Sequence, residues 1–413
     1  MKIKTTAIVG SIVLVLALPT AASGSLKSTS AASTIAHTCA KPLTIGFVAP
    51  VTGAIAASLA DSVAALKARV DAQNAKGGVN GCQVKVVVAD DGSSPTQAVT
   101  AAQTLIQSDD VDVLATTSFF TLLFSTAANQ AGVPVVGANF DGPEWGTQPN
   151  TNMFGNMGGV APSLPEPTTE AKLLKASGVT KLALICNDNP SAIKACQGQS
   201  LAAKSIGIDV TDDDTSVPST SLTLTTDALA AVQSHANGVF LQMGSAQNIA
   251  GATALSQQGF KGKILLAAGY GQQVLDNPSL IKSLQGALFE SFWQPVELNS
   301  PGTKTMQATL KKYAHLSGVP EFGAYEGYTT GDLAITALQA GGPHPTHKSI
   351  IAGMLKVTAW DADGISSSPI NFATSFGKGA EVSGANSCLY FLKLTGSKFV
   401  PVSTKPTCGT VVK

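Results

Sequence analysis

The chain has 413 residues, a length that suits two domains of ordinary size better than one. Hydrophobic residues make up 44% of it, enough for a sizeable core, whereas charged residues make up only 13%. Lysine plus arginine and aspartate plus glutamate both number 26, so the formal net charge is zero. This balance excludes the basic field of a typical nucleic-acid-binding protein, and we expect no nucleic-acid partner.

Residues 1–23 are interpreted as a secretory signal peptide. Lys2 and Lys4 make a positive start, residues 8–18 are apolar but too short to span a bilayer comfortably, and residues 21–23 are small. An uncleaved N-terminal anchor is the alternative. Residues 24–38 are rich in Ser, Thr and Ala and predict a disordered spacer. The mature protein is therefore expected outside the cytoplasm, in the periplasm, in the cell envelope or secreted.

Six cysteines in an exported chain are expected to pair. In the first pair, each cysteine lies just before one of two strands that we expect to be parallel neighbours. The second pair brackets a short loop after a strand, and the third flanks a hairpin. These positions favour three disulfides, Cys39–Cys82, Cys186–Cys196 and Cys388–Cys408. Free buried thiols are the alternative. The absence of a C-x-x-C spacing supports neither a redox motif nor a zinc ribbon, and we expect no metal or cofactor.

The first part of the chain, residues 43–141, alternates short apolar strands with helices. A strand at 43–48 leads through the turn 49–53 into one long helix expected over 55–76, which Gly77 and Gly78 end. Three more strands, each followed by a helix or a polar turn, are expected at 83–89, 111–115 and 133–137. Four such steps predict an α/β fold with a parallel sheet covered by helices on both faces. Ligands of such sheets bind outside the carboxyl ends of the strands.

Residues 146–170 interrupt the alternation and are interpreted as a crossing into a second lobe. Strands then recur at 181–186, 208–210, 238–242, 263–268 and 287–292. A second crossing near 294–301 precedes helices at 303–317 and 321–341, and a hairpin at 389–402 follows. The expected domains are 39–156 and 293–361 for the first lobe, and 157–292 and 362–413 for the second.

Five stretches, in this order along the chain, carry a resemblance to a known family. They are IGFVAPVTG at 45–53, NAKGGVNG at 74–81, DDGSSPTQA at 90–98, GVPVVG at 132–137 and LYFLKLTGSKFVP at 389–401. Together they resemble the solute-binding proteins of branched-chain amino-acid-type ABC transporters, of the periplasmic-binding-protein type I family. The resemblance implies two Rossmann-like lobes with parallel sheets, joined by a multi-strand hinge and closing around a small solute.

The resemblance also implies site residues in the first lobe. Ser118 falls where the family places a serine that holds the ligand carboxylate, and Phe119 follows it. Capping of the next helix is the alternative role for Ser118. Asn139 and Asp141 fall where the family uses a backbone carbonyl and a threonine hydroxyl. Asp141 either pairs with an ammonium group or begins the turn that follows it.

In the second lobe the chain departs further from the family. Tyr270 stands at the position of the acid that receives the ligand amino group, which puts an α-amino-acid ligand in doubt. Ser191 lies near one position at which the family has an aromatic residue, and Gly244, next to Met243, stands at another. An apolar, partly aromatic pocket is expected instead, formed by Phe119, Phe140, Met243, Tyr270 and Tyr325. Each of these aromatics is also compatible with a place in the core.

Signatures of catalysis are scarce in the chain. It has no Gly-x-Ser-x-Gly elbow, no phosphate-binding loop and no Gly-x-Gly-x-x-Gly after a strand, so we expect no enzymatic activity. The sequence predicts a monomeric solute-binding protein that captures a small carboxylate-bearing or amphipathic solute, an amino acid or another small carboxylate. The expected partner is the membrane permease of an ABC transporter. A ligand-sensing module of the same fold that feeds a receptor is the alternative.

Overall fold

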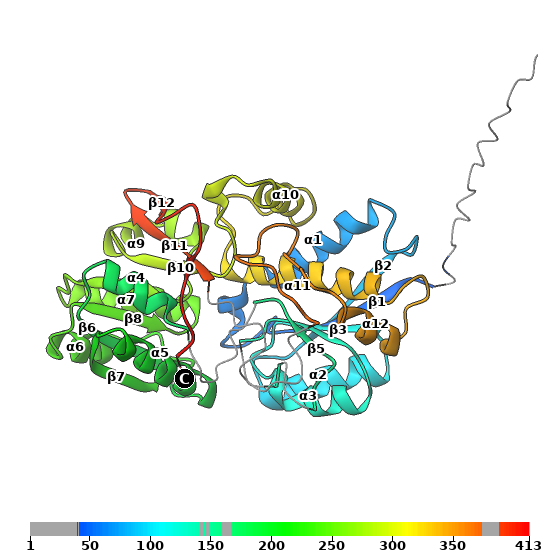
Figure 1. Cartoon of the computed structure of the whole chain (residues 1–413), viewed down its shortest axis with the longest axis horizontal. Helices are drawn as coiled ribbons and strands as arrows, with labels where there is room; N and C mark the ends of the chain where they lie inside the picture. Colours follow the sequence, from blue (N-terminus) through cyan, green and yellow to red (C-terminus); the bar gives the residue numbers. More distant parts are fainter. Residues whose placement is uncertain are drawn as a thin grey trace, which may run out of the picture. The chain divides into compact units, whose positions relative to one another are not determined.

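The structure of the chain is a computed structural model that describes residues 39, 41–140, 144–145, 149–157, 167–373 and 388–412. The expected signal peptide and spacer, and the candidate ligand residue Asp141, lie outside the described residues. Within the described part, two sheets with helices packed on them form two lobes (Figure 1). No helix in these residues is both long and apolar enough to cross a membrane.

The first sheet has five parallel strands in the order β2-β1-β3-β4-β5. The strands are β1 (Leu43–Ala49), β2 (Val84–Asp90), β3 (Val113–Thr116), β4 (Val135–Gly137) and β5 (Met153–Gly155). All seven residues of β1 are buried, as its continuous apolar run requires of an inner strand of a parallel sheet. The strand β5 was missed by the sequence interpretation, which treated 146–170 only as a crossing. Three residues without alternation are too short a pattern to indicate a strand.

The helices of the first lobe come from two separate parts of the chain. The first part contributes η1 (Ala56–Leu59), α1 (Ser62–Asn74), α2 (Pro95–Gln107) and α3 (Thr121–Gln130). The second part contributes η2 (Val296–Leu298), α10 (Pro301–Thr309), η3 (Leu310–Ala314), α11 (Phe322–Ala340) and α12 (His347–Met354). The helix α11 packs on α1 and on strands β3 and β4, so the chain returns to the first lobe after crossing from the second.

The single helix expected over 55–76 is wrong, because the chain breaks between η1 and α1. Asp61 takes a left-handed conformation with φ of 67° and ends the continuity of the helix. Two glycines of α11 pack directly against this break. A Cβ atom on Gly323 would lie 2.1 Å from the Ala60 carbonyl oxygen, and one on Gly327 would lie 2.0 Å from that of Ser62. The break therefore brings the backbone of α1 into close contact with α11.

The second sheet has the order β12-β11-β10-β9-β8-β6-β7, with β13 paired to β11. Its parallel strands are β6 (Lys181–Asn187), β7 (Asp209–Val217), β8 (Gly238–Gln242), β9 (Lys263–Leu266) and β10 (Leu288–Ser291). The antiparallel ones are β11 (Cys388–Thr395), β12 (Lys398–Pro401) and β13 (Thr407–Cys408). Its helices are α4 (Thr169–Ala176), α5 (Pro190–Ser205), α6 (Thr225–Gln233), α7 (Ser245–Gln257), α8 (Gln272–Leu275) and α9 (Pro278–Ser283).

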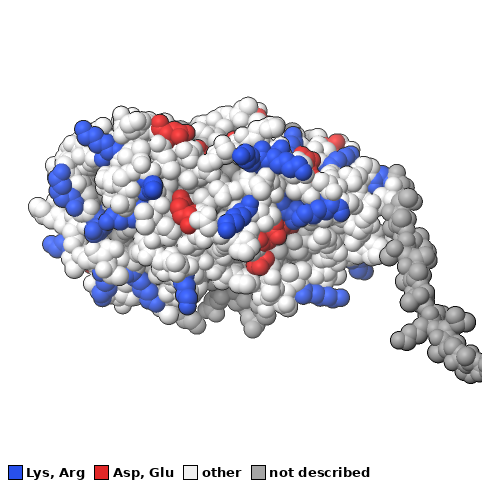
Figure 2. Space-filling view, turned by 90° about the horizontal axis from the view of Figure 1, so that it is seen from above, with Lys and Arg blue, Asp and Glu red and all other residues white. Residues whose placement is uncertain are grey.

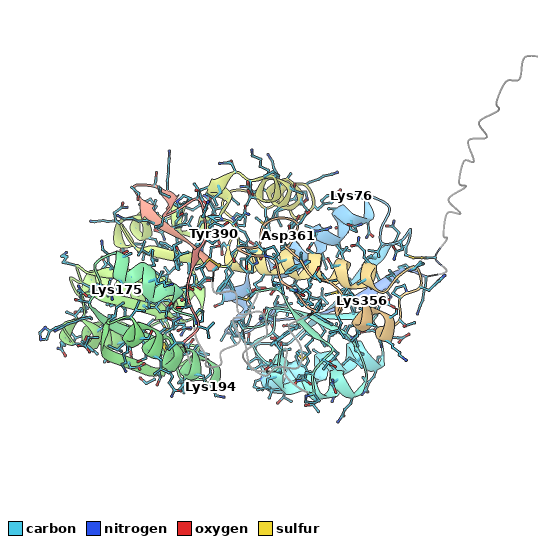
Figure 3. All side chains as sticks on the ribbon, in the orientation of Figure 1. Lys76, Lys175, Lys194, Lys356, Asp361 and Tyr390 are labelled. Atoms are coloured by element: carbon cyan, nitrogen blue, oxygen red, sulfur yellow. A yellow bond between two sulfur atoms is a disulfide. The ribbon has the colours of Figure 1, made fainter. Side chains whose placement is uncertain are left out.

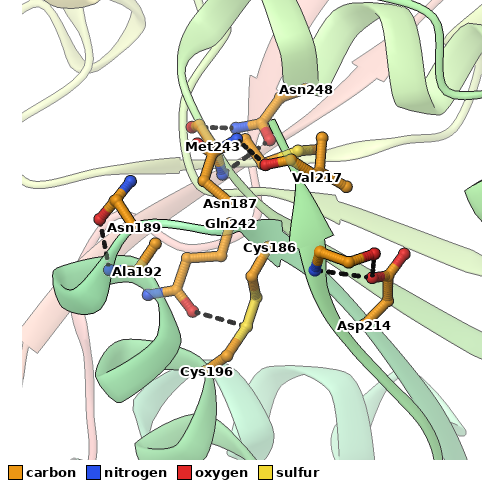
Figure 4. Close-up of a disulfide and its surroundings, with 11 residues drawn as sticks. Cys186, Asn187, Asn189, Ala192, Cys196, Asp214, Val217, Gln242, Met243 and Asn248 are labelled. Carbon is orange, nitrogen blue, oxygen red and sulfur yellow. Dashed lines mark hydrogen bonds between the residues drawn. A yellow bond between two sulfur atoms is a disulfide. The ribbon is translucent and has the colours of Figure 1, made fainter. Parts of the chain in front are cut away.

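The cysteines pair as the sequence predicts, in three disulfides. Cys388 and Cys408 face each other in the antiparallel register of β11 and β13. We expected Cys196 at the end of a loop, but it lies on α5, because that helix begins only three residues after β6 ends. The bond to Cys186 therefore ties the first half of α5 to the carboxyl end of β6 (Figure 4).

Candidate functional site

A small pocket lies at the carboxyl ends of strands of the second sheet, next to the start of α11. It is lined by residues after β9, on β10, in the crossing that follows and on α11: Ala268, Gly269, Tyr270, Glu290, Ser291, Trp293, Phe322 and Tyr325. This is the place where ligands bind in open α/β sheets. Three segments that are far apart in sequence supply its walls.

Aromatic rings form a continuous row along this pocket and beyond it. Trp293 stacks on Tyr325 with ring centroids 5.3 Å apart and planes at 5°. Phe322 lies 5.8 Å from Trp293 and 6.3 Å from Phe140, measured between ring centroids. Phe140 in turn lies 4.5 Å from Phe119, which follows β3 of the first lobe. The row therefore connects the strand ends of the first sheet with the pocket, and it offers an apolar surface to a ligand.

Tyr270 and Tyr325 both line the pocket, with ring centroids 6.3 Å apart. The Tyr270 hydroxyl donates a hydrogen bond of 2.5 Å to the Glu297 carboxylate and accepts one from the backbone N–H of Val296. Burial, and then the neighbouring Tyr325 and Glu297, raise the pKa of Tyr270 well above its usual value. Tyr270 thus presents a neutral phenol, whose hydroxyl is bonded to a carboxylate from η2.

Ser118 lies in the turn between β3 and α3 and is fully buried. Its hydroxyl accepts a hydrogen bond from the backbone N–H of Phe120, and its own N–H donates to the Thr116 hydroxyl. Burial raises the pKa of the nearby Asp91, and a hydrogen bond with the Ser118 side chain opposes that rise. These contacts order the turn before α3. Ser118 does not cap that helix, the alternative role considered for it, because the N-cap position of α3 is Phe120 and no side chain caps it.

The neighbouring Thr117 was not singled out from the sequence. Its hydroxyl is buried and has no hydrogen-bond partner among the described residues. A buried hydroxyl of this kind is costly unless something else satisfies it, such as a ligand or a water molecule. The only sequence signal was its place in the polar run Thr116-Thr117-Ser118 after a strand. Thr117 is therefore a second candidate, besides Ser118, for contact with a ligand carboxylate.

The remaining predicted residues do not line the pocket. The Asn139 side-chain oxygen accepts a hydrogen bond from the backbone N–H of Met157, which ties the segments that follow β4 and β5 together. Met243 follows β8, and its backbone N–H and carbonyl group both bond to the Asn248 side chain (Figure 4). Ser191 lies in the first turn of α5. The predicted set is thus dispersed, with Tyr270 and Tyr325 alone on the pocket wall.

Glu326, on α11 next to Tyr325, is completely buried. The Asn156 side-chain N–H group donates to the Glu326 carboxylate at 2.8 Å and to the hydroxyls of Thr329 and Thr330 at 2.9 and 3.0 Å. Burial raises the pKa of Glu326 to about 8, and the hydrogen bond from Asn156 opposes that rise. This network joins the residue after β5 to the helix that carries Phe322 and Tyr325.

The raised pKa of Glu326 predicts a pH dependence of stability. The folded protein keeps the proton on this carboxyl up to about pH 8, whereas the unfolded chain loses it near 4.5. The unfolded state therefore binds fewer protons in this window, and the free energy of unfolding falls as the pH rises through it. In urea titrations between about pH 5 and 8, Glu326→Gln is expected to show a shallower fall than the unchanged protein. An equal fall in both would contradict this assignment, and Asp71→Asn, at an exposed site on α1, is the control.

The two lobes of parallel α/β sheet, with a pocket at strand ends beside a returning helix, define a two-lobed binding protein. The sequence profile of the periplasmic binding protein family matches residues 42–398, and the chain belongs to that family. It is accordingly a binding protein of the type I fold and not an enzyme. No curated protein sequence matches the chain.

Several solved structures share the fold. A fatty acid ABC transporter substrate-binding protein from Thermomonospora curvata is 19% identical, covers 89% of this chain and 93% of its own, and has a TM-score of 0.73. A branched chain amino acid ABC transporter protein from Thermus thermophilus with bound valine is 20% identical. The match covers 90% of this chain and 97% of that protein, with a TM-score of 0.72. A solute binding protein from R. palustris in complex with benzoate is 17% identical. The match covers 90% of this chain and 97% of that protein, with a TM-score of 0.71. At these identities the likeness shows the fold alone.

Proposed function

We propose that this protein is an extracytoplasmic solute-binding protein that captures a small solute with an apolar group and a carboxylate, and delivers it to an ABC transporter permease. The observation that carries the proposal is the aromatic wall of the pocket, made by Tyr270, Trp293, Phe322 and Tyr325. The similar structures named above include proteins for fatty acids, valine and benzoate, each of which has a carboxylate and an apolar group. Closure of the two lobes on the solute is the mechanism we propose for signalling the loaded state to the permease.

Two pocket residues, Tyr270 and Glu290, differ in whether they favour a solute that carries an amino group. Tyr270, at the position of the family acid, favours a carboxylate that lacks one. Glu290 lines the same pocket from β10 and is 5% exposed, so a carboxylate is still present there. A carboxylate beside aromatic rings suits an ammonium group. The neighbouring strand would then supply the charge that the family takes from the position of Tyr270.

A thermal-shift screen tests the proposal and separates these solutes. The panel contains branched and aromatic amino acids, their deaminated acids, benzoate-type acids and medium-chain fatty acids. A ligand at about a thousand times its Kd stabilises the protein by roughly 4 kcal/mol, which raises Tm by several degrees. We expect a shift with an apolar carboxylate. A shift with amino acids only, abolished in Glu290→Gln, would assign the ammonium contact to Glu290. A panel without any shift would count against the proposed solute class.

The contact with the carboxylate is tested by two hydroxyl deletions in the turn after β3. Ser118→Ala is expected to weaken solute binding by tenfold or more, roughly 1.4 kcal/mol, in titration calorimetry. Thr117→Val removes the neighbouring hydroxyl at nearly constant volume. A loss in Thr117→Val with unchanged affinity in Ser118→Ala would move the contact to Thr117. Unchanged affinity in both variants would reject this turn as the carboxylate site.

A further inference from the structure

Six exposed lysines lie on two segments that do not line the aromatic pocket. Both segments contain lysines and no acidic residue. Residues 301–315, which form α10 and η3, hold Lys304, Lys311 and Lys312, and residues 388–408, which form the terminal hairpin, hold Lys393, Lys398 and Lys405. All six side chains are exposed. Figure 2 shows the molecule from above, with more Lys and Arg than Asp and Glu on the face in view.

These two segments form one continuous surface, although about 75 residues separate them in sequence. The short helix η2 packs against both α10 and β12 and connects the two. On the hairpin, the register pairs Lys393 with Val400 and Thr395 with Lys398, so both lysines point to the same side as Val400. Val400 is 45% exposed and Val402 is 48% exposed. The basic face, defined by the six lysines, thus includes an exposed apolar patch.

The acidic run Asp212, Asp213 and Asp214 lies on β7, the edge strand of the second sheet opposite β12. Several other carboxylates are buried and contribute nothing to the surface, among them Glu326 and Asp332. Acidic side chains also lie near lysines, since exposed Asp363 lies beside α10 and Lys204 lies near Asp213, so the basic face is a local excess of lysine.

We propose that the basic face binds the surface of an anionic lipid bilayer. Lysines near such a surface are attracted individually, without specific geometry, and clusters of four to eight suffice for binding. An interface for a protein partner would instead be rich in Arg, Tyr and Trp and poor in Lys. The chain has one arginine, Arg69, which is buried in an ion pair. The face is rich in lysine, the residue that protein interfaces lack, which favours a lipid surface over a permease surface as its partner.

The test is co-sedimentation of the purified exported protein with vesicles of phosphatidylcholine, with and without phosphatidylglycerol. We expect binding only to the vesicles with phosphatidylglycerol, and weaker binding as the salt concentration rises. The triple variant Lys304→Gln, Lys311→Gln, Lys398→Gln is expected to lower the partition coefficient on the order of a hundredfold, since each lysine contributes about a factor of five.

A matched control neutralises three lysines elsewhere, Lys194, Lys204 and Lys356. Lys194 and Lys204 are exposed on α5, and Figure 3 shows Lys194 and Lys356 away from α10 and the hairpin. The control is expected to keep its binding. Thermal unfolding and solute binding are expected to be unchanged in both triple variants. Absent binding to anionic vesicles, equal binding to phosphatidylcholine alone, or an equal loss in the control would overturn the proposal. Binding to neutral vesicles only when they contain the permease would overturn it in favour of a protein partner.

Discussion

Replacing Arg69 by alanine is expected to lower the free energy of unfolding by about 3–5 kcal/mol. Arg69 on α1 donates to the Asp332 carboxylate on α11 through Nε at 3.0 Å and through a terminal nitrogen at 2.8 Å. The Trp360 indole N–H donates to the other carboxylate oxygen at 2.9 Å. Both charged side chains are about nine-tenths buried, so removal of the arginine leaves a buried carboxylate without its cation.

Urea denaturation measures this loss, with Lys67→Ala as the matched control. Lys67 is exposed on the same helix, and its removal is expected to change stability by no more than about 0.5 kcal/mol. The ion pair also fixes α11 on α1, and α11 carries the pocket residues Phe322 and Tyr325. A loss below about 1 kcal/mol in Arg69→Ala would mean that the pair is dispensable.

Replacing Phe322 by alanine is expected to weaken solute binding by about ten- to a hundredfold, measured by calorimetry with the best solute from the screen. Phe322 lines the pocket and contacts the rings of Trp293, Phe292 and Phe140. Burial of a phenylalanine side chain is worth about 1.5–3 kcal/mol, and the solute loses part of that contact area in the variant.

Phe260→Ala separates a lost ligand contact from a general loss of packing. Phe260 is also half-buried and packs on the core, but it follows α7 and does not line the pocket. Both variants are expected to lose similar stability, whereas only Phe322→Ala loses affinity. Equal affinity in the two variants would place the solute away from this pocket.

The sequence was sufficient for the features that depend on neighbouring residues. The buried run Leu43–Ala49, the glycines that follow α1 and the turn between β11 and β12 each have a local pattern with a local physical cause. The motifs that resemble the family are turn and packing positions of the same kind. These motifs predicted the fold class, and the positions of the cysteines beside expected strands predicted the three pairs. The structure contains both.

The break between η1 and α1 could not be read from the sequence. Residues 55–76 have an unbroken helical period, and the break becomes favourable only because Gly323 and Gly327, more than 250 residues later, allow close contact of two backbones. The ion pair of Arg69 with Asp332 likewise joins α1 to α11, two helices that are distant in sequence. Each of these features depends on a partner that the local pattern does not contain.

The pocket shows the same division between local and long-range information. Tyr270 was predicted from its alignment with a family site position and Tyr325 as an aromatic of the expected pocket, whereas Glu290, Trp293 and Phe322 were not predicted. On the sequence alone, these three belong to a buried strand, a crossing and a helix start. Only the folded chain brings them to one wall, because a pocket is formed by whichever residues three distant segments present at the same point. The sequence by itself therefore determined the class of protein, and the tertiary structure decided which side chains meet at the pocket.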